Sequence, residues 1–184
     1  MAFLVLLIAV LSRVVPHLLH TTGGNVTCVG AGLLYFGASL RGRNRAMALI
    51  AVAAMAATDW WLTVYAYGYP FHISGYVVTW IWYAAVCLGA SALLQRKTVL
   101  RLGVAALASS TSFFLLSNGM VWLRGNMYDH TAAGLTQCYV AGLPFYRNDL
   151  ASTLVFTAIF FLLPSVATIQ SWAHGMGDNG AAAA

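Results

Sequence analysis

Side chains of the kinds that bind ligands gather in four separate stretches of this chain, although most of the sequence is apolar. Histidine, aspartate, arginine, tyrosine and tryptophan can together hold a small molecule through a few polar anchors on apolar walls. Four of the five histidines belong to this group, and imidazole is also a common metal ligand. The group, called here the outer-face set, contains His17, His20, Asn25, Asp59, Trp60, Tyr65, Tyr67, Tyr69, His72, Asn118, Trp122, Arg124, Tyr128, Asp129, His130, Tyr139, Tyr146, Arg147 and Asp149.

Two interpretations of this set remain open from residue types alone. Tryptophan and tyrosine gather at any membrane interface, so an aromatic belt would account for them. A belt does not require histidine, arginine and aspartate on the same face, which favours a small-molecule site. The chain has no glutamate and no HExxH, GxSxG or glycine-rich phosphate motif, so it is predicted not to be an enzyme. A membrane enzyme would have to rely on Asp59 and His72.

The elements that position these residues are predicted to be membrane-spanning helices. The chain is 61% hydrophobic and 7% charged, with a mean hydropathy of +0.79, whereas a soluble domain has roughly 25% charged residues. The fold class is therefore an all-α integral membrane protein. Residues 1–174 are predicted to form one domain of six transmembrane helices, followed by a disordered tail over 175–184. The predicted spans cover 2–19, 26–40, 46–67, 76–94, 99–123 and 150–172.

Six basic residues set the orientation of these spans. They lie in two short loops and comprise Arg41, Arg43, Arg45, Arg96, Lys97 and Arg101. Because cytoplasmic loops carry the excess of lysine and arginine, both loops are predicted to face the cytoplasm, with the N- and C-termini on the same side. The net charge of +5 is explained by this placement and does not indicate a nucleic-acid partner.

Asp59 is the one acidic residue predicted within a span, where a carboxylate is costly. Arg13, His17, His20 and Arg124 are its candidate partners. A structural ion pair and a direct ligand contact both remain open. The loop over 124–149 is predicted to be functional or a lid, because 26 residues are more than a tight connection needs.

Small residues and cysteines indicate close packing. The span over 26–40 holds Gly30, Gly32 and Gly37, which allow neighbouring backbones to approach closely. The cysteines show no CxxC pairing, so a zinc site is not expected. A bridge between Cys28 and Cys138 is compatible with the topology, but isolated buried thiols are favoured.

With six spans, few charges and an outward site, the chain resembles the S components of energy-coupling-factor (ECF) transporters, which capture vitamins. The segments NVTCVGAGLLYFG, Thr58-Asp59, SNGMVWL and GLTQCYVAGLPFYRN also resemble a bacterial family of putative transport proteins of unknown function. The resemblance implies a multi-pass protein of the bacterial cytoplasmic (inner) membrane. It would bind a vitamin in an outward-facing cavity and carry it across the bilayer.

Among S components, the cobalamin-binding BtuM-type proteins are the most similar in character. This resemblance implies cobalamin as the transported ligand, rather than as a cofactor, with His72 facing the cobalt. It also implies an ECF ATPase module as a partner, although the usual Ala-xxx-Ala motif of span one is here Ala9 and Arg13. The predicted substrate-binding residues are His20, Asp59, Tyr67, Tyr69, His72, Tyr76, Trp122, Tyr139 and Arg147.

The alternative function is a small accessory subunit of a larger membrane complex. Such a subunit is expected to expose a stripe of small residues, for which Ala46, Ala53 and Ala57 are candidates. It is also expected to lack a closed outer cavity.

Overall fold

All the elements of the computed structural model are helical among the residues it describes, which are 1–18, 26–40 and 42–181, with side chains over 1–18, 26–40 and 45–162. The all-α prediction is confirmed. In chain order the elements are α1 (Ala2–Ser12), α2 (Val15–Leu18), α3 (Val29–Ser39), the 3₁₀ segment η1 (Gly42–Met47), α4 (Ala48–Trp61), the π-helical turn η2 (Leu62–Ala66), the 3₁₀ turn η3 (Ile73–Gly75), α5 (Val77–Leu93), α6 (Val99–Arg124) and α7 (Ala132–Ala181).

Two helical stretches of the described chain, Arg45–Ala66 and Val99–Arg124, are long and apolar enough to cross a membrane. Ala2–Ser12, Val29–Ser39 and Val77–Leu93 are apolar but shorter. About 20 residues are needed to cross a bilayer core of about 30 Å. The fold is therefore compatible with a membrane protein.

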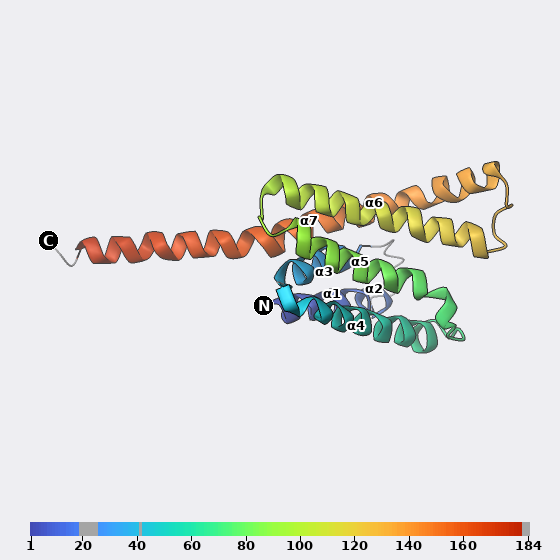
Figure 1. Ribbon diagram of the computed structural model, residues 1–184, viewed down its shortest axis with the longest axis horizontal. Helices are drawn as coiled ribbons and strands as arrows, with labels where there is room; N and C mark the ends of the chain where they lie inside the picture. The colour runs from blue at the N-terminus through green and yellow to red at the C-terminus, as the bar shows by residue number, and fades with distance from the viewer. Residues whose placement is uncertain (19–25, 41, 182–184) are drawn as a thin grey trace.

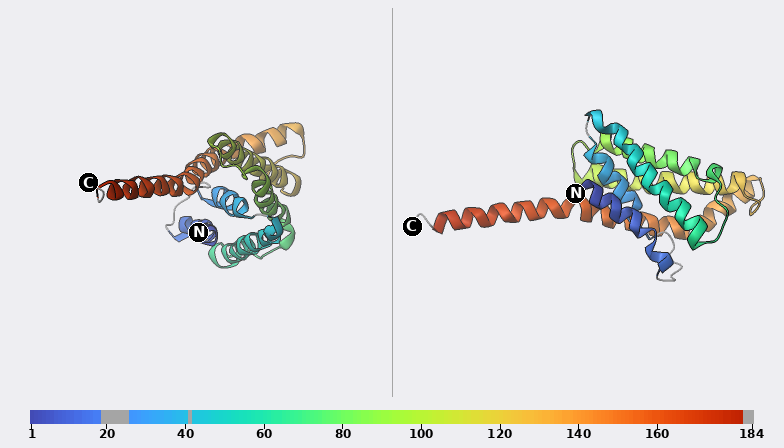
Figure 2. Two further views of the ribbon diagram at one scale, coloured as in Figure 1. Left: turned by 60° about the vertical axis from the view of Figure 1, so that its left-hand side comes forward. Right: turned by 90° about the horizontal axis from the view of Figure 1, so that it is seen from below.

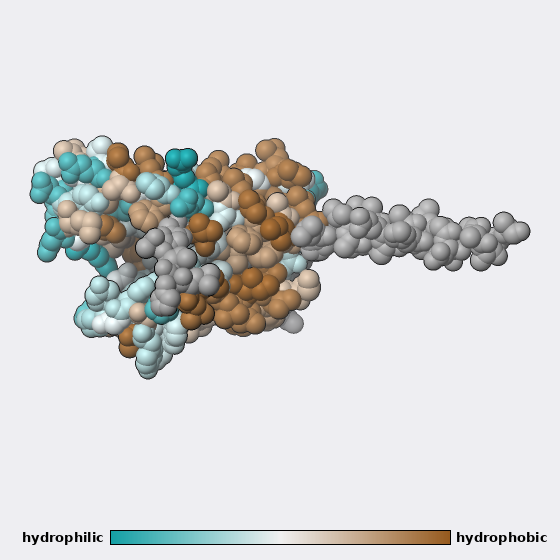
Figure 3. All heavy atoms as spheres, turned by 180° about the vertical axis from the view of Figure 1, so that it is seen from behind, coloured by the Kyte–Doolittle hydropathy of each residue, from teal (hydrophilic) through white to brown (hydrophobic). Residues whose placement is uncertain are grey.

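The helices lie side by side in one bundle (Figure 1). The N-terminus and the α3–α4 and α5–α6 connections lie at one end, and the α4–α5 and α6–α7 connections lie at the other. The two further views show the same arrangement, with α7 leaving the bundle at the N-terminal end (Figure 2). Figure 3 shows a broad apolar band over the helices and polar residues around the α4–α5 and α6–α7 connections. This polar end is called the loop end below.

Helix α3 forms the centre of the bundle because its small residues let other helices approach. A Cβ atom added to Gly32 would collide with Ala9 of α1, and one added to Gly37 would collide with the backbone of Cys87 of α5. A Cβ on Gly30 would lie 2.7 Å from Oγ1 of Thr153 on α7. Leu33, Leu34 and Phe36 of α3 are buried. The prediction that this segment packs closely is confirmed.

Helix α3 supports only part of the length of α6. Its 11 residues correspond to about 16 Å, whereas the 26 residues of α6 correspond to about 39 Å. The N-terminal turn of α3 meets α6 at Ser109, since a Cβ on Gly30 would lie 3.5 Å from that hydroxyl. The remainder of α6 therefore extends toward the loop end beyond α3.

The predicted long loop over 124–149 is wrong. Helix α6 ends at Arg124 and α7 begins at Ala132, so only a short connection joins them. Gly134, Gly142 and Pro144 disfavour a helix locally, but the segment packs along α6, and this tertiary contact outweighs local propensity. A lid made from this segment is excluded, and the residues up to Asp149 are held in a helix.

Two other boundaries differ from the sequence prediction or stay untested. The first predicted span is interrupted after Ser12, where Arg13 caps α1 and the short α2 follows. Helix α7 continues to Ala181, into the stretch predicted as a disordered tail. The domain limits of 1–174 and 175–184 stay predictions.

The three cysteines are free and buried. Cys28 begins α3, Cys87 lies on α5 and Cys138 lies on α7. The Cys138 thiol donates to the carbonyl of Asn118 at 3.3 Å. The prediction of isolated buried thiols is confirmed.

Candidate functional site

Asp59 is buried in an ion-pair network that joins three helices. Its side chain is 3% exposed and pairs with Arg13, the residue that caps α1. Arg13 also donates to the Thr58 hydroxyl at 2.8 Å and to the Met55 carbonyl at 3.1 Å. The indole N–H of Trp80 on α5 donates to the second carboxylate oxygen at 2.8 Å. Both oxygens of Asp59 are thus engaged within the protein.

Among the candidate partners of Asp59, the structure selects Arg13. This geometry is that of a structural ion pair, one of the two alternatives open from sequence. A ligand contact by Asp59 stays a prediction. Ala9 and Arg13 both face the inside of the bundle, Ala9 against Gly32 and Arg13 against Asp59. The departure from an Ala-xxx-Ala motif therefore concerns an internal contact and carries no information on an ATPase partner.

Aromatic side chains extend this network toward the loop end. The rings of Phe71, Tyr76 and Trp80 stack, with centroids 5.0 Å apart for Phe71 and Tyr76 and 6.2 Å apart for Tyr76 and Trp80. The Tyr76 hydroxyl lies 2.5 Å from the Thr63 hydroxyl. Thr63 in turn donates to the Asp59 carbonyl at 2.7 Å, within the π-helical turn η2. The start of α5 is therefore held firmly against the end of α4.

The predicted site residues fall into two separate groups. Asp59, Tyr67, Tyr69, His72 and Tyr76 lie on α4, the start of α5 and the connection between them. Tyr67 and Tyr69 are 58% and 68% exposed, and His72 is exposed. His20 lies outside the described residues. The second group lies on α6 and α7 and comprises Trp122, Tyr139 and Arg147.

Most members of the second group are engaged in contacts between neighbouring segments. The Trp122 indole donates to the Asp129 carbonyl at 2.9 Å, and the Tyr139 hydroxyl donates to the Leu115 carbonyl at 2.9 Å. Arg147 is exposed. None of the predicted substrate-binding residues that the structure describes lines either pocket described next. Their assignment to one site stays a prediction.

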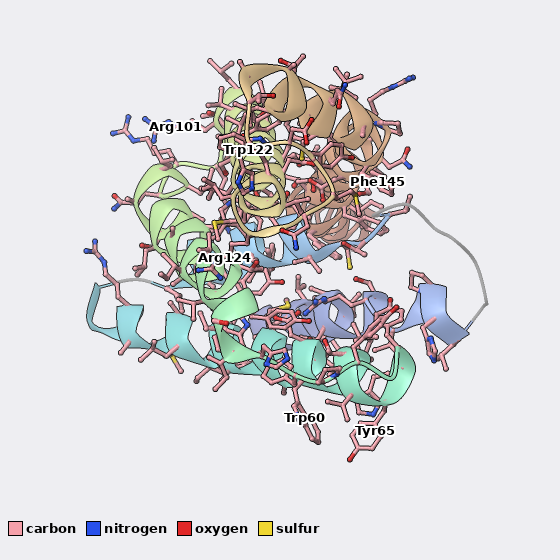
Figure 4. All side chains as sticks on the ribbon, turned by 90° about the vertical axis from the view of Figure 1, so that its right-hand side faces the viewer. Trp60, Tyr65, Arg101, Trp122, Arg124 and Phe145 are labelled. Carbon is pink, nitrogen blue, oxygen red and sulfur yellow. The ribbon has the colours of Figure 1, made fainter. Side chains whose placement is uncertain are left out.

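The larger pocket, of about 570 Å³, lies between α5 and α6 at the loop end. Trp82, Phe113 and Met120 contribute to its mainly apolar walls. Thr79 and Ser117 add hydroxyls, and Arg124 lies at its mouth. Figure 4, viewed from the loop end, shows Arg124 beside the start of α5. Its guanidinium donates to the Ser74 carbonyl, so it joins α6 to the α4–α5 connection.

A smaller pocket of about 140 Å³ lies between α6 and α7. Both pockets are lined by Phe113, Ser117 and Val121, which follow one another at helical spacing along α6. The two pockets therefore flank one stripe of α6. The rest of the smaller pocket comes from Ser110, Phe114, Asn118, Gly142, Phe145, Tyr146 and Asp149.

Asp149 is the residue whose setting sequence reasoning missed. It was assigned to the end of a long loop, yet it lies within α7 and faces the smaller pocket. The signal was present in the spacing of Gly142, Phe145, Tyr146 and Asp149, which places all four on one helical face. Trp60 and Tyr65, by contrast, point away from the bundle (Figure 4), as expected of an aromatic belt.

No group of three or more His, Cys, Asp or Glu side chains in the described part of the chain is arranged to hold a metal ion. The polar groups that line the pockets are hydroxyls, two amides, one carboxylate and one guanidinium. This combination on apolar walls is suited to binding an organic molecule.

The fold and the pockets define an all-helical protein with apolar helices of membrane-crossing length and a cavity at one end of the bundle. The chain matches, over residues 1–174, the family described as "Family of unknown function (DUF6580)", and it belongs to that family. No curated protein and no solved structure matches the chain.

Proposed function

We propose that this chain is a six-span membrane transport protein that captures a small organic solute from the outer side. The connections that hold Arg45, Arg96 and Lys97 lie at the same end of the bundle as the N-terminus (Figure 1). The loop end lies opposite and carries the larger pocket. Since basic loops face the cytoplasm, the pocket opens to the outside in this orientation, and both termini are cytoplasmic.

The outer surface of the bundle supports a lipid environment. Large apolar side chains are exposed on α1, α5, α6 and α7, including Leu7, Ile81, Leu107 and Val155. In water such a shell would be an extensive apolar patch. In a bilayer it faces lipid, and the helices satisfy their own backbone hydrogen bonds.

The observation that carries the proposal is the pocket of about 570 Å³ at the loop end. Its volume falls within the roughly 300–1,000 Å³ of sites for drug-sized ligands. Its apolar walls and few polar groups suit binding, and no motif for catalysis accompanies them. A vitamin-sized molecule would fit there, as in the S components that the sequence resembles.

Cobalamin, the ligand implied by that resemblance, is larger than the molecules such a pocket suits. Its binding would need contacts beyond the two pockets, and the exposed His72 on the α4–α5 connection is the predicted cobalt contact. Uptake with an ECF ATPase module is part of the same proposal.

The cobalamin prediction is tested by an absorbance spectrum. Protein purified in detergent, incubated with cobalamin and passed through gel filtration is expected to retain a corrinoid band with a shifted spectrum, because imidazole coordination changes the cobalt ligand field. His72→Ala is expected to lose the shift, while Ser74→Ala in the same connection keeps it. Absence of a retained band would exclude cobalamin and leave smaller solutes as candidates.

Filling the shared stripe of α6 tests the pocket itself. Ser117 lines both pockets, so Ser117→Trp is expected to weaken binding of a captured solute at least tenfold, about 1.4 kcal/mol. The solute is first sought by thermal-shift screening of water-soluble vitamins and their precursors. Leu115→Trp, on an exposed position of the same helix, is the matched control. Equal affinities in the two variants, or no binding in the screen, would contradict solute capture in these pockets.

One observation favours the alternative of an accessory subunit. Ala46, Ala53 and Ala57 are all exposed on one stretch around α4, as a helix-docking stripe requires. Purification of the protein from native membranes distinguishes the two functions. An accessory subunit is expected to be recovered with its partners in a stoichiometric complex, and Ala53→Leu is expected to disrupt that complex.

A further inference from the structure

The smaller pocket holds the carboxylate of Asp149, and no cationic side chain is found among the described residues that line it. Asp149 is partly buried, and it lines the smaller pocket together with Ser110. Within the described part of the chain the single ion pair is that of Arg13 and Asp59. Among the described residues, Asp59 is therefore paired with a cation and Asp149 is not.

The depth of Asp149 makes this absence significant. Its neighbour Ser110 is the twelfth residue of α6, about 17 Å from the start of a helix about 39 Å long. Measured along α6, which forms the fifth proposed span, this is near the middle of the bilayer. The sixth span therefore begins well before residue 150, where the sequence prediction placed its start. A charged carboxylate is costly there, and unpaired ionisable residues at such depth mark ligand or ion sites.

The walls around Asp149 are aromatic. Phe113, Phe114, Phe145 and Tyr146 all line the smaller pocket. The rings of Phe114 and Tyr146 lie 4.9 Å apart, and the Tyr146 hydroxyl lies 3.0 Å from that of Thr111, which fixes the ring. Aromatic faces attract cations, and several of them around an ammonium group form the cage that binds choline-like ligands.

The volumes and lining residues of the two pockets indicate which part of a ligand each pocket suits. About 140 Å³, at roughly 30 Å³ for each water-sized group, accommodates about four or five non-hydrogen atoms, the size of a methylated ammonium head. The larger pocket has walls of Val78, Trp82, Leu116 and Met120 and suits an uncharged body. Four of the ten residues that line the smaller pocket are aromatic, and one carries a carboxylate. This lining favours an organic ammonium group, and the sodium chloride arm of the experiment below tests for an inorganic cation.

We propose that the two pockets bind an organic cation, with its ammonium head against Asp149 and the rings of the smaller pocket and its body in the larger pocket. The inference rests on the proposed solute-capture function and specifies its substrate class. It also separates this ligand class from cobalamin, which the pocket volumes do not suit.

Choline and its uncharged isostere 3,3-dimethylbutan-1-ol are the probes that test this assignment. The thermal unfolding of the full-length protein in detergent is followed with choline chloride, with the isostere plus sodium chloride, and with sodium chloride alone, at equal ionic strength. Choline is expected to raise the midpoint, and the apparent affinity for choline is expected to exceed that for the isostere at least tenfold. Asp149→Asn is expected to abolish this preference.

Two controls separate the possible outcomes. Asp129→Asn changes a carboxylate in the exposed α6–α7 connection and is expected to keep the preference for choline. The unfolding midpoint of Asp149→Asn without ligand, compared with that of the wild type, shows whether this variant folds. Equal binding of choline and isostere, unaffected by Asp149→Asn, overturns the cation assignment but leaves solute capture intact. A shift with sodium chloride alone, or no choline binding by the wild type, overturns the organic-cation proposal, and loss of all solute binding in the vitamin screen separately overturns solute capture.

Discussion

Replacing Asp59 by asparagine is expected to lower the free energy of unfolding by about 3–5 kcal/mol, the cost of leaving one partner of a buried ion pair without its counter-charge. Arg13 is only 17% exposed and makes its other hydrogen bonds to Thr58 and Met55. Most of this side chain is therefore shielded from water in the folded protein. Asparagine keeps an acceptor for the Trp80 indole, so the loss of stability reports the missing charge and not a missing hydrogen bond.

A double-mutant cycle separates the charge effect from packing. Arg13→Met is expected to be destabilising because it leaves the Asp59 carboxylate buried without a cation. The combined Arg13→Met and Asp59→Asn variant is expected to be more stable than either single variant, since no uncompensated charge remains. The measurement is reversible denaturant unfolding in detergent micelles. If the two single effects add, the pair is not coupled and the network described above does not hold the helices together.

Gly37→Ala is expected to disrupt the centre of the bundle. The added Cβ would collide with the Cys87 carbonyl, lie 2.7 Å from the Cys87 Cα and lie 2.9 Å from the Ala90 Cβ. These obstacles are mostly backbone and cannot rotate away, so α3 and α5 must separate. Overpacking typically costs about 1–3 kcal/mol, and the upper end is expected here because α3 is also packed tightly against α1 and α7.

Gly89→Ala is the matched control on α5, because nothing lies within 4 Å of the position its Cβ would take. Alanine favours a helix over glycine by about 1 kcal/mol, so this variant is expected to be as stable as the wild type or slightly more stable. Melting temperature and elution from gel filtration report both variants. Equal melting temperatures for the two variants would show that α3 and α5 are not in close contact at Gly37.

Helices that are apolar along their whole length were predicted well from the sequence. The predicted spans over 26–40, 76–94 and 99–123 agree closely with α3, α5 and α6. The first part of α7 was not predicted, because residues 132–149 are amphipathic and contain glycine and proline. Mean hydropathy identifies only segments that are apolar on average. This segment is helical because one of its faces packs on α6, which mean hydropathy does not detect.

The sequence by itself determined the helical, apolar character of the chain and the close packing of its glycine-rich segment, and it favoured isolated thiols over a Cys28–Cys138 bridge. These follow from composition and local spacing, which act on each segment separately. Only the tertiary structure decided that Arg13 neutralises Asp59, whereas Asp149 faces a partly aromatic pocket whose described lining holds no cationic side chain. Whether a buried carboxylate has a cationic partner depends on which helices meet and at what depth. These contacts join segments that are far apart in the sequence.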